Sequence, residues 1–474
     1  MGLTFLLLYI ILSTIAFLSV VLYGARPARS LSWTIVIFAL PFLGILLYLI
    51  LGVNRRKLKL LTLKQNSRRQ LYDKIYDPEF EPREKKFHQS NKLAQLQKLI
   101  YENSGFRVAH NNKVKVLSSG EGTFGAIFEA MENAKKFIHL QYYIIEEGEI
   151  MDRLYQVCKK KTEEGVEIRI LYDTLGSFSW SSKSIKKFKQ LGVKMFPILP
   201  FEFGSIIFSI NHRNHRKIVV IDGKIGFTGG FNVSDKYIKA DSELGVWDDT
   251  HLELRGPVVQ DLHRIFIKDY YFSSKGEQLV NDRYLPKIET AGDTQVQVIA
   301  DGPDTDQASI LQQYLKLISL AQRSICISNP YFIPDSSLFE TLKIAALSGV
   351  EIDILVPAKS DSKLAKFSMF SYFEDLLRVG ISIYTQHDNF LHSKVMVVDG
   401  EVVSVGSGNF DVRSFEHNFE TNVIVYDQDI ASNLFDQFKE DCSRCEKLSL
   451  ENFSERSIWQ KFAEGFARFF SPIL

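Results

Sequence analysis

The chain has 474 residues, which is too many for a single hydrophobic core, so at least two globular units are expected. Lys and Arg number 57 against 56 Asp and Glu, and this balance argues against a nucleic-acid-binding protein, which usually carries a basic excess. Four scattered cysteines exclude a disulfide-rich secreted domain and favour a reducing compartment. Cys442 and Cys445 form an isolated CxxC pair, so no zinc site is expected.

The amino terminus holds two uncharged apolar stretches, residues 3–23 and 33–53. Each is 21 residues long, and about 20 apolar residues are needed to cross the hydrocarbon core of a bilayer. The first stretch lacks the basic start and the small-residue cleavage site of a signal peptide, which indicates a retained anchor. We therefore expect residues 1–54 to form two transmembrane helices.

Basic residues flank these stretches unequally. The connection between them contains Arg26 and Arg29, and the second stretch is followed by Arg55, Arg56, Lys57, Lys59, Lys64, Arg68 and Arg69. The positive-inside rule places this basic flank, and the chain after it, in the cytoplasm. The expectation is a multi-pass membrane protein with both ends of the hairpin cytoplasmic. Residues 55–110 are predicted to form a basic linker that includes a short helix near residues 92–101.

The remaining sequence contains an internal repeat. Each copy has an apolar strand, a helix, a strand that begins at Gly-Val-Glu-Ile, another helix and a strand that begins at glycine; Gly165 of the first copy corresponds to Gly349 of the second. Alternating strands and helices predict an α/β fold in which helices cover a sheet. We expect two α-β-α sandwich domains related by duplication, residues 111–290 and 291–474, after the transmembrane hairpin.

The repeat ends in its most informative element, a His-x-Lys-x4-Asp motif followed by a glycine-rich segment and an asparagine. The first copy runs from His215 to Asn232 and the second from His392 to Asn409, with the motif residues offset by 177 positions. The other members are Lys217, Asp222, Gly229 and Gly230 in the first copy, and Lys394, Asp399, Gly406 and Ser407 in the second. One HxK pattern is common by chance, but two complete copies at equal spacing are a specific signal.

Each motif is predicted to form a β-hairpin. Residues two apart on a strand point to the same face, so the histidine and the lysine of each copy project together. Asp-Gly between two apolar runs favours a type I′ turn. Asp222 and Asp399 are candidate catalytic residues as members of the motif, although their place at the turn, on the opposite strand face, favours a structural role.

Each half therefore offers groups that suit a phosphate. Glycine lets backbone N–H groups approach an anion closely. The candidate phosphate ligands are Asn232, Asn409, Gly229, Gly230, Gly406 and Ser407. A phosphodiester needs a nucleophile on one side and an acid for the leaving oxygen on the other, which two facing histidines supply. The two lysines would stabilise the transition-state charge, so neither a metal nor a cofactor is expected.

A histidine in this role usually needs a carboxylate on its other ring nitrogen. Each carboxylate is expected to come from the same half of the chain as its histidine. In the second half the candidate is Glu420, and in the first half it is Asp249, with Asp248 and Glu243 as alternatives.

At these residues the chain resembles the phospholipase D superfamily, whose signature is the duplicated His-Lys-Asp motif. Further segments are similar to bacterial cardiolipin synthases, among them LYDTLGS from Leu171, WDDTH from Trp247, NPYFIPD from Asn329 and RSFEHNFETN from Arg413. The chain departs from the superfamily pattern at Gly230, where serine is usual, and at Asp248, where many members have arginine.

The resemblance implies a phosphatidyltransferase of the bacterial cell membrane, whose partners are the phospholipids phosphatidylglycerol and cardiolipin, with no nucleic acid. Two phosphatidylglycerols would give cardiolipin and glycerol, reversibly, through a phosphohistidine. His215 is favoured as nucleophile and His392 as acid and base, although the near-symmetry leaves their order open. Alternatives are a phospholipase D hydrolase, a transferase with another alcohol acceptor, a nuclease and a non-enzymatic scaffold; neutral charge opposes the nuclease. No protein partner is predicted.

The carboxyl terminus holds an aromatic stripe. Trp459, Phe462, Phe466 and Phe469 recur at helical spacing. Such an amphipathic helix either lies at a membrane interface or packs on its own domain, and the pattern alone favours neither.

Overall fold

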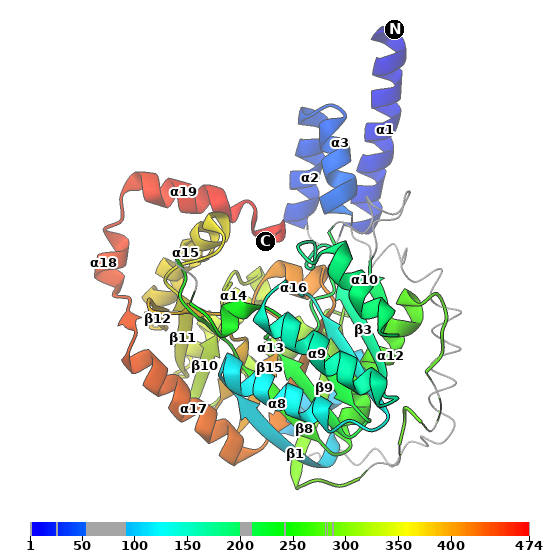
Figure 1. The fold of residues 1–474 in the computed structure, drawn as a ribbon. Coiled ribbons are helices and arrows are strands. Elements are labelled where there is room, and N and C mark those ends of the chain that lie inside the picture. Colours follow the sequence, from blue (N-terminus) through cyan, green and yellow to red (C-terminus); the bar gives the residue numbers. More distant parts are fainter. Residues whose placement is uncertain are drawn as a thin grey trace. The chain divides into compact units, whose positions relative to one another are not determined.

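The structure is a computed structural model that describes residues 2–24, 27–53, 92–199, 211–240, 243–279, 281, 283–286 and 289–473. It divides into two compact units (Figure 1). One contains the N-terminal helices, and the other, much larger, contains both copies of the repeat. Most of the predicted basic linker lies outside the described residues.

The N-terminal unit begins with α1 (Gly2–Tyr23), an apolar helix of 22 residues. Residues Leu3–Tyr23 are long and apolar enough to cross a membrane, as the sequence predicts. Large apolar side chains along this helix are exposed, from Leu3 at one end to Leu22 at the other. An apolar exterior of this kind is typical of a helix that contacts lipid.

The second apolar stretch is not one helix. It is divided into α2 (Pro27–Ala39), α3 (Leu43–Leu47) and the π-helical segment η1 (Tyr48–Gly52). The break falls at Pro41, which has no N–H with which to continue the helix, and Phe42 takes a positive φ of 61°. The expectation of a continuous transmembrane helix over residues 33–53 is therefore corrected.

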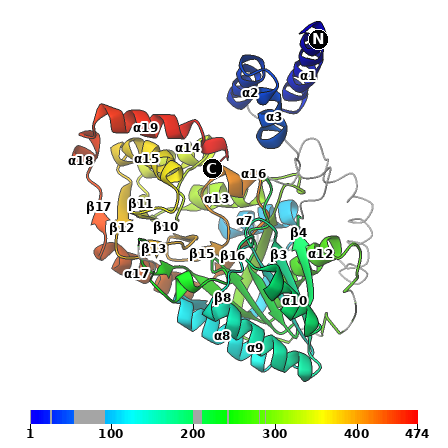
Figure 2. The same cartoon turned by 45° about the horizontal axis from the view of Figure 1, so that its top comes forward.

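The larger unit is built around one 15-stranded sheet (Figures 1 and 2). The first repeat contributes β1 (Ala109–Leu117), β2 (Phe137–Tyr142), β3 (Glu167–Asp173), β4 (Lys194–Ile198), β5 (Ile218–Ile221), β6 (Ile225–Gly229) and β8 (His251–Arg255). The second contributes β9 (Thr294–Asp301), β10 (Ser324–Ser328), β11 (Glu351–Pro357), β12 (Ser382–Gln386), β14 (Val395–Val398), β15 (Val402–Gly406), β16 (Glu420–Tyr426) and β17 (Glu446–Lys447).

The strand order is symmetric about the junction of the two repeats. It runs β17-β12-β11-β10-β14-β15-β16-β9-β1-β8-β6-β5-β2-β3-β4. Antiparallel pairing of β1 with β9 joins the halves, and reading outward from that pair meets corresponding strands in the same order. The predicted duplicated α/β architecture is confirmed, with both copies sharing one continuous sheet.

Helices flank the sheet in each half. The first half has α8 (Gly120–Glu132), α9 (Glu149–Glu163), α10 (Ser182–Gln190), η2 (Asp235–Tyr237) and α12 (Val258–Ser273). The second has α13 (Ser309–Leu320), α14 (Ser336–Leu347), α15 (Lys363–Arg378), α16 (Val412–Glu416), α17 (Gln428–Ser443), α18 (Leu450–Ser454), α19 (Ile458–Arg468) and η3 (Ser471–Ile473). Each half has its own hydrophobic core. The helix predicted near residues 92–101 is present as α7 (Lys92–Ser104) and adds Leu96 and Ile100 to the second core.

The C-terminal helix α19 is both packed and exposed. Ala467 and Glu464 are buried on one side, where Glu464 Oε2 accepts a hydrogen bond from Arg456 at 2.7 Å. The aromatic stripe remains accessible, with Trp459 78% and Phe469 81% exposed. Packing on its own domain therefore leaves the aromatic face open, and its contact with a membrane stays a prediction.

Both motif hairpins have the predicted turn. Asp222 and Gly223 have φ values of 53° and 68°, and Asp399 and Gly400 have 55° and 64°. A type I′ turn requires positive φ at both central residues, and aspartate followed by glycine meets that requirement at low cost.

The turn aspartates hold each hairpin against the neighbouring strand. The Asp222 carboxylate accepts hydrogen bonds from the backbone N–H groups of Lys135, Lys136 and Phe137 at 2.7–2.9 Å, beside the start of β2. The Asp399 carboxylate does the same for Gln322, Arg323 and Ser324, beside the start of β10. Each aspartate lies seven positions after its histidine, which is roughly 20 Å along an extended chain. These contacts favour the structural role, and a catalytic role for Asp222 and Asp399 stays a prediction.

Candidate active site

Each motif histidine is tied through its backbone to the opposite half. His215 precedes β5, and its N–H donates to the carbonyl of Phe419 at 2.9 Å. His392 follows β13 (Phe390–Leu391), and its N–H donates to the carbonyl of Asp248 at 2.7 Å. There β13 pairs in parallel with β7 (Trp247–Asp248), which belongs to the first half.

The orienting carboxylates are exchanged between the halves. Nδ1 of His215 lies 3.1 Å from both carboxylate oxygens of Glu420, and Nδ1 of His392 lies 2.5 Å from Oδ2 of Asp249. Pairing each carboxylate with the histidine of its own half was therefore wrong. The reason is the bridging just described: each histidine bonds to the residue that precedes the carboxylate of the other half.

The two alternatives to Asp249 lie elsewhere. The Asp248 carboxylate accepts hydrogen bonds from Gln386 Nε2 at 2.6 Å and Asn389 Nδ2 at 3.3 Å. Glu243 is exposed. Asp249 is thus the first-half carboxylate that meets a motif histidine.

Glu420 is held as a carboxylate by its surroundings. It accepts hydrogen bonds from Ser407 Oγ at 2.5 Å, Ser414 Oγ at 3.0 Å and Asn418 Nδ2 at 3.3 Å. Burial acts to raise its pKa, but the adjacent His215, the Lys217 ammonium and the Ser407 hydroxyl outweigh burial and lower the pKa. An ionised Glu420 favours the His215 tautomer with the proton on Nδ1, which leaves the Nε2 lone pair for attack.

The carboxylate of Asp249 is buried and closely packed. Burial raises the pKa of Asp249 to about 6, although Lys394 and the backbone N–H of Thr250 act to lower it. A Cβ atom added at Gly230 would lie 2.0 Å from Asp249 Oδ1. Glycine at position 230 therefore leaves the space that this carboxylate occupies.

Both histidines are buried and both have lowered pKa values. For His215 burial is the main cause, with Glu420 opposing it and Lys217 adding to it. For His392 burial acts first, followed by Lys394 and Lys217, and the pKa falls well below its ordinary value. Both rings are therefore neutral without substrate. A bound phosphodiester anion would favour protonation of a ring beside it, which is the state that an acid requires.

Two buried lysines, Lys217 and Lys394, lie beside the motif histidines. Lys217 Nζ donates to the carbonyl of His215 at 2.7 Å, and Lys394 Nζ donates to the carbonyl of His392. Burial lowers the pKa of Lys217 to about 7 and that of Lys394 to about 8, while the nearby carboxylates oppose this shift. An anion placed between them would stabilise both charged forms, so the site is electrostatically suited to a phosphate.

The glycine-rich segments pack closely against neighbouring strands. The N–H groups of Gly230 and Ser407 donate to the carbonyls of Thr250 and Thr421 at 3.0 Å, and that of Gly406 donates to Lys394 O at 3.3 Å. A Cβ at Gly229 would lie 2.4 Å from Thr250 O, and one at Gly406 would lie 2.1 Å from Asn422 Oδ1. The backbone donors predicted to be open at Gly230, Gly406 and Ser407 are engaged in strand pairing, which corrects their expected role.

The motif asparagines are buried beside the site. Asn232 Oδ1 accepts from Ile144 N at 3.2 Å, and Asn232 Nδ2 donates to the Tyr237 hydroxyl at 3.3 Å. That hydroxyl lies 3.3 Å from His392 Nδ1. The backbone N–H of Asn409 donates to Ser414 Oγ at 3.0 Å. Phosphate binding by Asn232 and Asn409 stays a prediction.

Aromatic side chains pack against both motif histidines. The Tyr143 ring is 4.9 Å from the His215 ring, and the Trp247 ring is 5.0 Å from the His392 ring. Tyr143 follows a buried strand and Trp247 precedes Asp249 by two positions, so both carried a usable signal. Tyr237 follows the first motif by only five positions, in the 3-10 helix η2, but no residue pattern marked it.

The amino-acid sequence is similar to those of known proteins. A family model described as cardiolipin synthase, phospholipase D-like domain, matches residues 127–270 and 314–442. The cardiolipin synthase of Geobacillus thermodenitrificans is 39% identical over 455 residues, which cover 96% of this chain and 90% of the relative. A probable cardiolipin synthase of Bacillus subtilis is 38% identical over 474 residues, covering 99% and 93%. The chain belongs to the cardiolipin synthase family.

Two further comparisons agree with this family. A model described as phospholipase D-nuclease N-terminal matches residues 11–52. The crystal structure of phosphatidylserine synthase from Haemophilus influenzae shares the fold, with a TM-score of 0.61 and 15% identity over 81% of this chain and 100% of that one. Family membership makes the chain a phosphatidyltransferase of the phospholipase D type, and with the apolar helix α1 it associates the protein with membranes.

Proposed function

We propose that this member of the family makes cardiolipin from two molecules of phosphatidylglycerol and releases glycerol. The observation that carries the proposal is the pair of buried histidines, each on a carboxylate from the other half, with two buried lysines of lowered pKa. Such a site neutralises one phosphodiester and offers it a nucleophile and an acid.

In the first step His215 attacks the phosphorus of a bound phosphatidylglycerol. The bond from Nε2 to phosphorus forms, the bond to the glycerol oxygen breaks, and His392 gives that oxygen a proton. His215 is the better nucleophile because the ionised Glu420 supports its developing positive charge, whereas burial raises the pKa of Asp249. Lys217 and Lys394 stabilise the negative oxygens of the transition state.

The second step reverses these roles. His392, now neutral, accepts the proton of a glycerol hydroxyl on the second phosphatidylglycerol. That oxygen attacks phosphorus, the bond from phosphorus to His215 breaks, and cardiolipin is released. One phosphodiester is consumed and another is formed. Substrates and products are therefore close in free energy, and the transfer is reversible. A hydrolase would use water in this step and form phosphatidic acid.

We infer that the catalytic unit is cytoplasmic and that the protein is integral to the membrane. Helix α1 is apolar along the whole of its length. The basic cluster from Arg55 to Arg69 follows the apolar region, and the positive-inside rule assigns such a flank to the cytoplasm. Its lipid partners are phosphatidylglycerol and cardiolipin, and basic residues at this place favour anionic head groups.

The test uses the purified full-length protein in phosphatidylglycerol vesicles, with lipids resolved after incubation. We expect cardiolipin and free glycerol in equal amounts, and no product from His215→Ala or His392→Ala. Phosphatidic acid without cardiolipin would establish hydrolysis instead. Adding a second alcohol to the vesicles checks whether other acceptors compete.

A further inference from the structure

The broken apolar stretch of residues 27–53 bears on how the protein sits in its membrane. We propose that α2, α3 and η1 form a re-entrant hairpin, which enters the hydrocarbon and returns to the same side, while α1 alone crosses. This hairpin is an interaction surface for lipid acyl chains.

The first support is that the stretch folds back on itself. A Cβ added at Gly44 would lie 2.1 Å from the carbonyl oxygen of Val36, and one at Gly52 would lie 2.7 Å from Cε2 of Trp33. Positions 36 and 33 of α2 therefore face positions 44 and 52 in reverse order. Gly44 allows the two antiparallel segments to pack at backbone distance, as small residues do between membrane helices, and Gly52 leaves room for the Trp33 indole.

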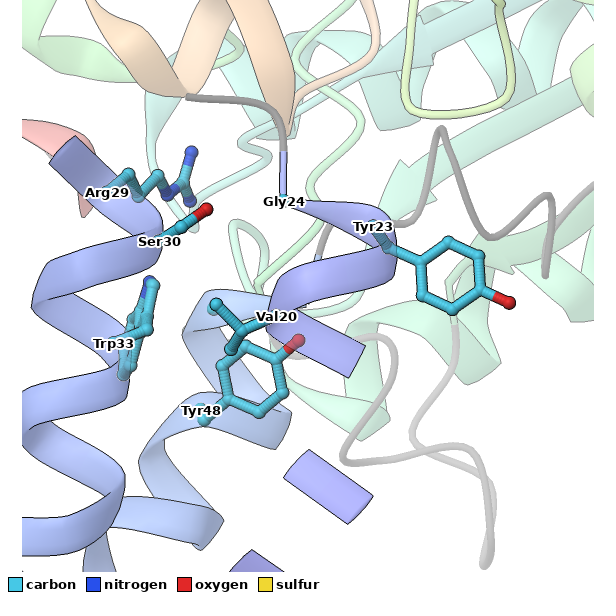
Figure 3. A pocket seen from close by; sticks show the side chains of 8 residues that line it. Val20, Tyr23, Gly24, Arg29, Ser30, Trp33 and Tyr48 are labelled. Carbon is cyan, nitrogen blue, oxygen red and sulfur yellow. The ribbon is translucent and has the colours of Figure 1, made fainter. Parts of the chain in front are cut away.

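The second support is that both ends of the hairpin lie beside the same end of α1. A pocket there is lined by residues of α1, α2 and η1: Val20, Tyr23, Gly24, Arg29, Ser30, Trp33, Tyr48 and Gly52 (Figure 3). Ser30 lies so close that a Cβ at Gly24 would be 2.2 Å from its Oγ. Arg29 Nη2 donates to the carbonyl of Leu51 at 3.5 Å, so the hairpin ends where it began.

The third support is the depth of the turn. The Tyr9 hydroxyl donates to the carbonyls of Ile37 and Phe38 at 3.2 Å, and its ring lies 5.5 Å from that of Phe42. The turn is thus level with Tyr9, and at 1.5 Å per residue it reaches roughly 22 Å along α1 from Gly24. The hydrocarbon is about 30 Å thick and α1 is about 33 Å long, so the turn stops short of the far surface.

A turn inside hydrocarbon requires internal partners for its backbone groups. Leu40 N donates to Val36 O at 3.1 Å, Leu43 N to Pro41 O at 2.7 Å and Gly44 N to Leu40 O at 2.7 Å. Proline at position 41 brings no N–H group that would need a partner. The outer surface of the hairpin is apolar, with exposed Leu31, Ile35, Phe38, Leu43 and Leu46.

The topology changes the side on which the first basic residues lie. Two full spans would place Arg26 and Arg29 opposite the cluster from Arg55 to Arg69. A re-entrant hairpin places all of them on one side, which satisfies the positive-inside rule more completely. Gly2 and the catalytic unit then lie on opposite sides of the membrane.

Single cysteines test the topology in the full-length protein. Gly2→Cys, Pro27→Cys and Lys189→Cys report on the start of α1, the start of α2 and the catalytic unit. Each variant is treated with a membrane-impermeant maleimide in intact and in permeabilised cells, with the unaltered chain as background. We expect positions 27 and 189 to share a side and position 2 to lie on the other.

Two full spans would give the opposite grouping, with positions 2 and 189 together and position 27 apart, and that result would overturn the proposal. Three positions on one side would overturn it as well. Accumulation of each variant in the membrane fraction at the level of the unaltered chain shows that it has folded, and Ala28→Cys replaces Pro27→Cys if the latter does not accumulate. The labelling needs no catalysis, so its outcome is independent of the proposed function.

Discussion

At the scale of single residues, the chemistry depends on which carboxylate meets which imidazole. Glu420 and Asp249 each serve a histidine from the other half, and they differ in character. Glu420 has its pKa lowered and accepts hydrogen bonds from three further side chains, while the pKa of Asp249 is raised by burial. This asymmetry supports the proposed roles of His215 as nucleophile and His392 as acid in an otherwise symmetric site.

Replacing Glu420 by glutamine tests the exchange between the halves. The side chain keeps its size but loses the charge that fixes the proton on Nδ1 of His215. We expect kcat to fall by about 10⁴-fold with little change in KM, the order found when the carboxylate of a catalytic histidine is neutralised. Steady-state kinetics on phosphatidylglycerol vesicles gives both constants. An unchanged kcat would show that Glu420 does not orient His215.

Gly230→Ala tests the space around Asp249. The added Cβ would displace the Asp249 carboxylate from His392, so we expect a loss of activity as large as that of Asp249→Asn. The matched change in the second half, Ser407→Ala, removes one hydroxyl donor to Glu420. Its expected cost is about 1–2 kcal/mol, which is roughly a tenfold effect on rate. Equal activity in Gly230→Ala and the unaltered protein would contradict this account of position 230.

The pH dependence of kcat/KM follows from the shifted groups of the free enzyme. Below a pKa of about 6, Asp249 is protonated and no longer supports a protonated His392. Above about 7 and about 8, Lys217 and Lys394 lose their protons, and the site loses its attraction for phosphate. We expect a bell-shaped profile with its maximum between these limits. A profile that still rises above about pH 8 would contradict the lysine assignment.

At the scale of elements, each motif hairpin carries chemistry at one end and structure at the other. Histidine and lysine lie where the halves meet, whereas aspartate closes the turn and binds three backbone N–H groups of the neighbouring segment. The motif therefore combines a catalytic pair with the hydrogen bonds that position its strand.

Asp222→Asn separates these two roles. An amide oxygen without charge is a weaker acceptor for three N–H donors, so we expect the free energy of unfolding to fall by about 2 kcal/mol. The kcat of the folded protein should stay close to that of the unaltered chain, because the histidine site is distant. Thermal unfolding and active-site-normalised kinetics measure the two effects. A collapse of kcat at full stability would restore Asp222 as a catalytic residue.

At the scale of the whole molecule, neither half contains a complete site. Arg216 of the first half donates from Nε to Glu420 O at 3.2 Å and from Nη2 to Asp301 O at 2.9 Å, both in the second half. Nη1 of the same arginine binds Asp269 at 2.7 Å. Together with the pairing of β1 and β9, these bonds fix the geometry across the junction. The duplicated fold is thus a requirement of the mechanism.

Much of this organisation could be predicted from local sequence signals. The repeat, the Asp-Gly turns and the His-Lys pairs depend on spacing within a few residues, which the sequence displays directly. The exchange of Glu420 and Asp249 could not be predicted, because it depends on strand contacts such as β13 with β7, more than 100 positions apart. The break at Pro41 was indicated by the proline itself, but the uniformly apolar composition of residues 33–53 favoured a continuous helix. The use of Gly230 and Gly406 for packing required the positions of their neighbours.

The central claim is that one histidine, His215, carries the phosphatidyl group between two lipids. Phosphatidylglycerol labelled at phosphorus is mixed with the full-length protein, quenched in alkali, in which phosphohistidine survives, and the protein is digested and mapped. We predict label on the peptide that contains His215, and none in His215→Ala. Label on the His392 peptide alone, or cardiolipin formation without any labelled peptide, would contradict the account.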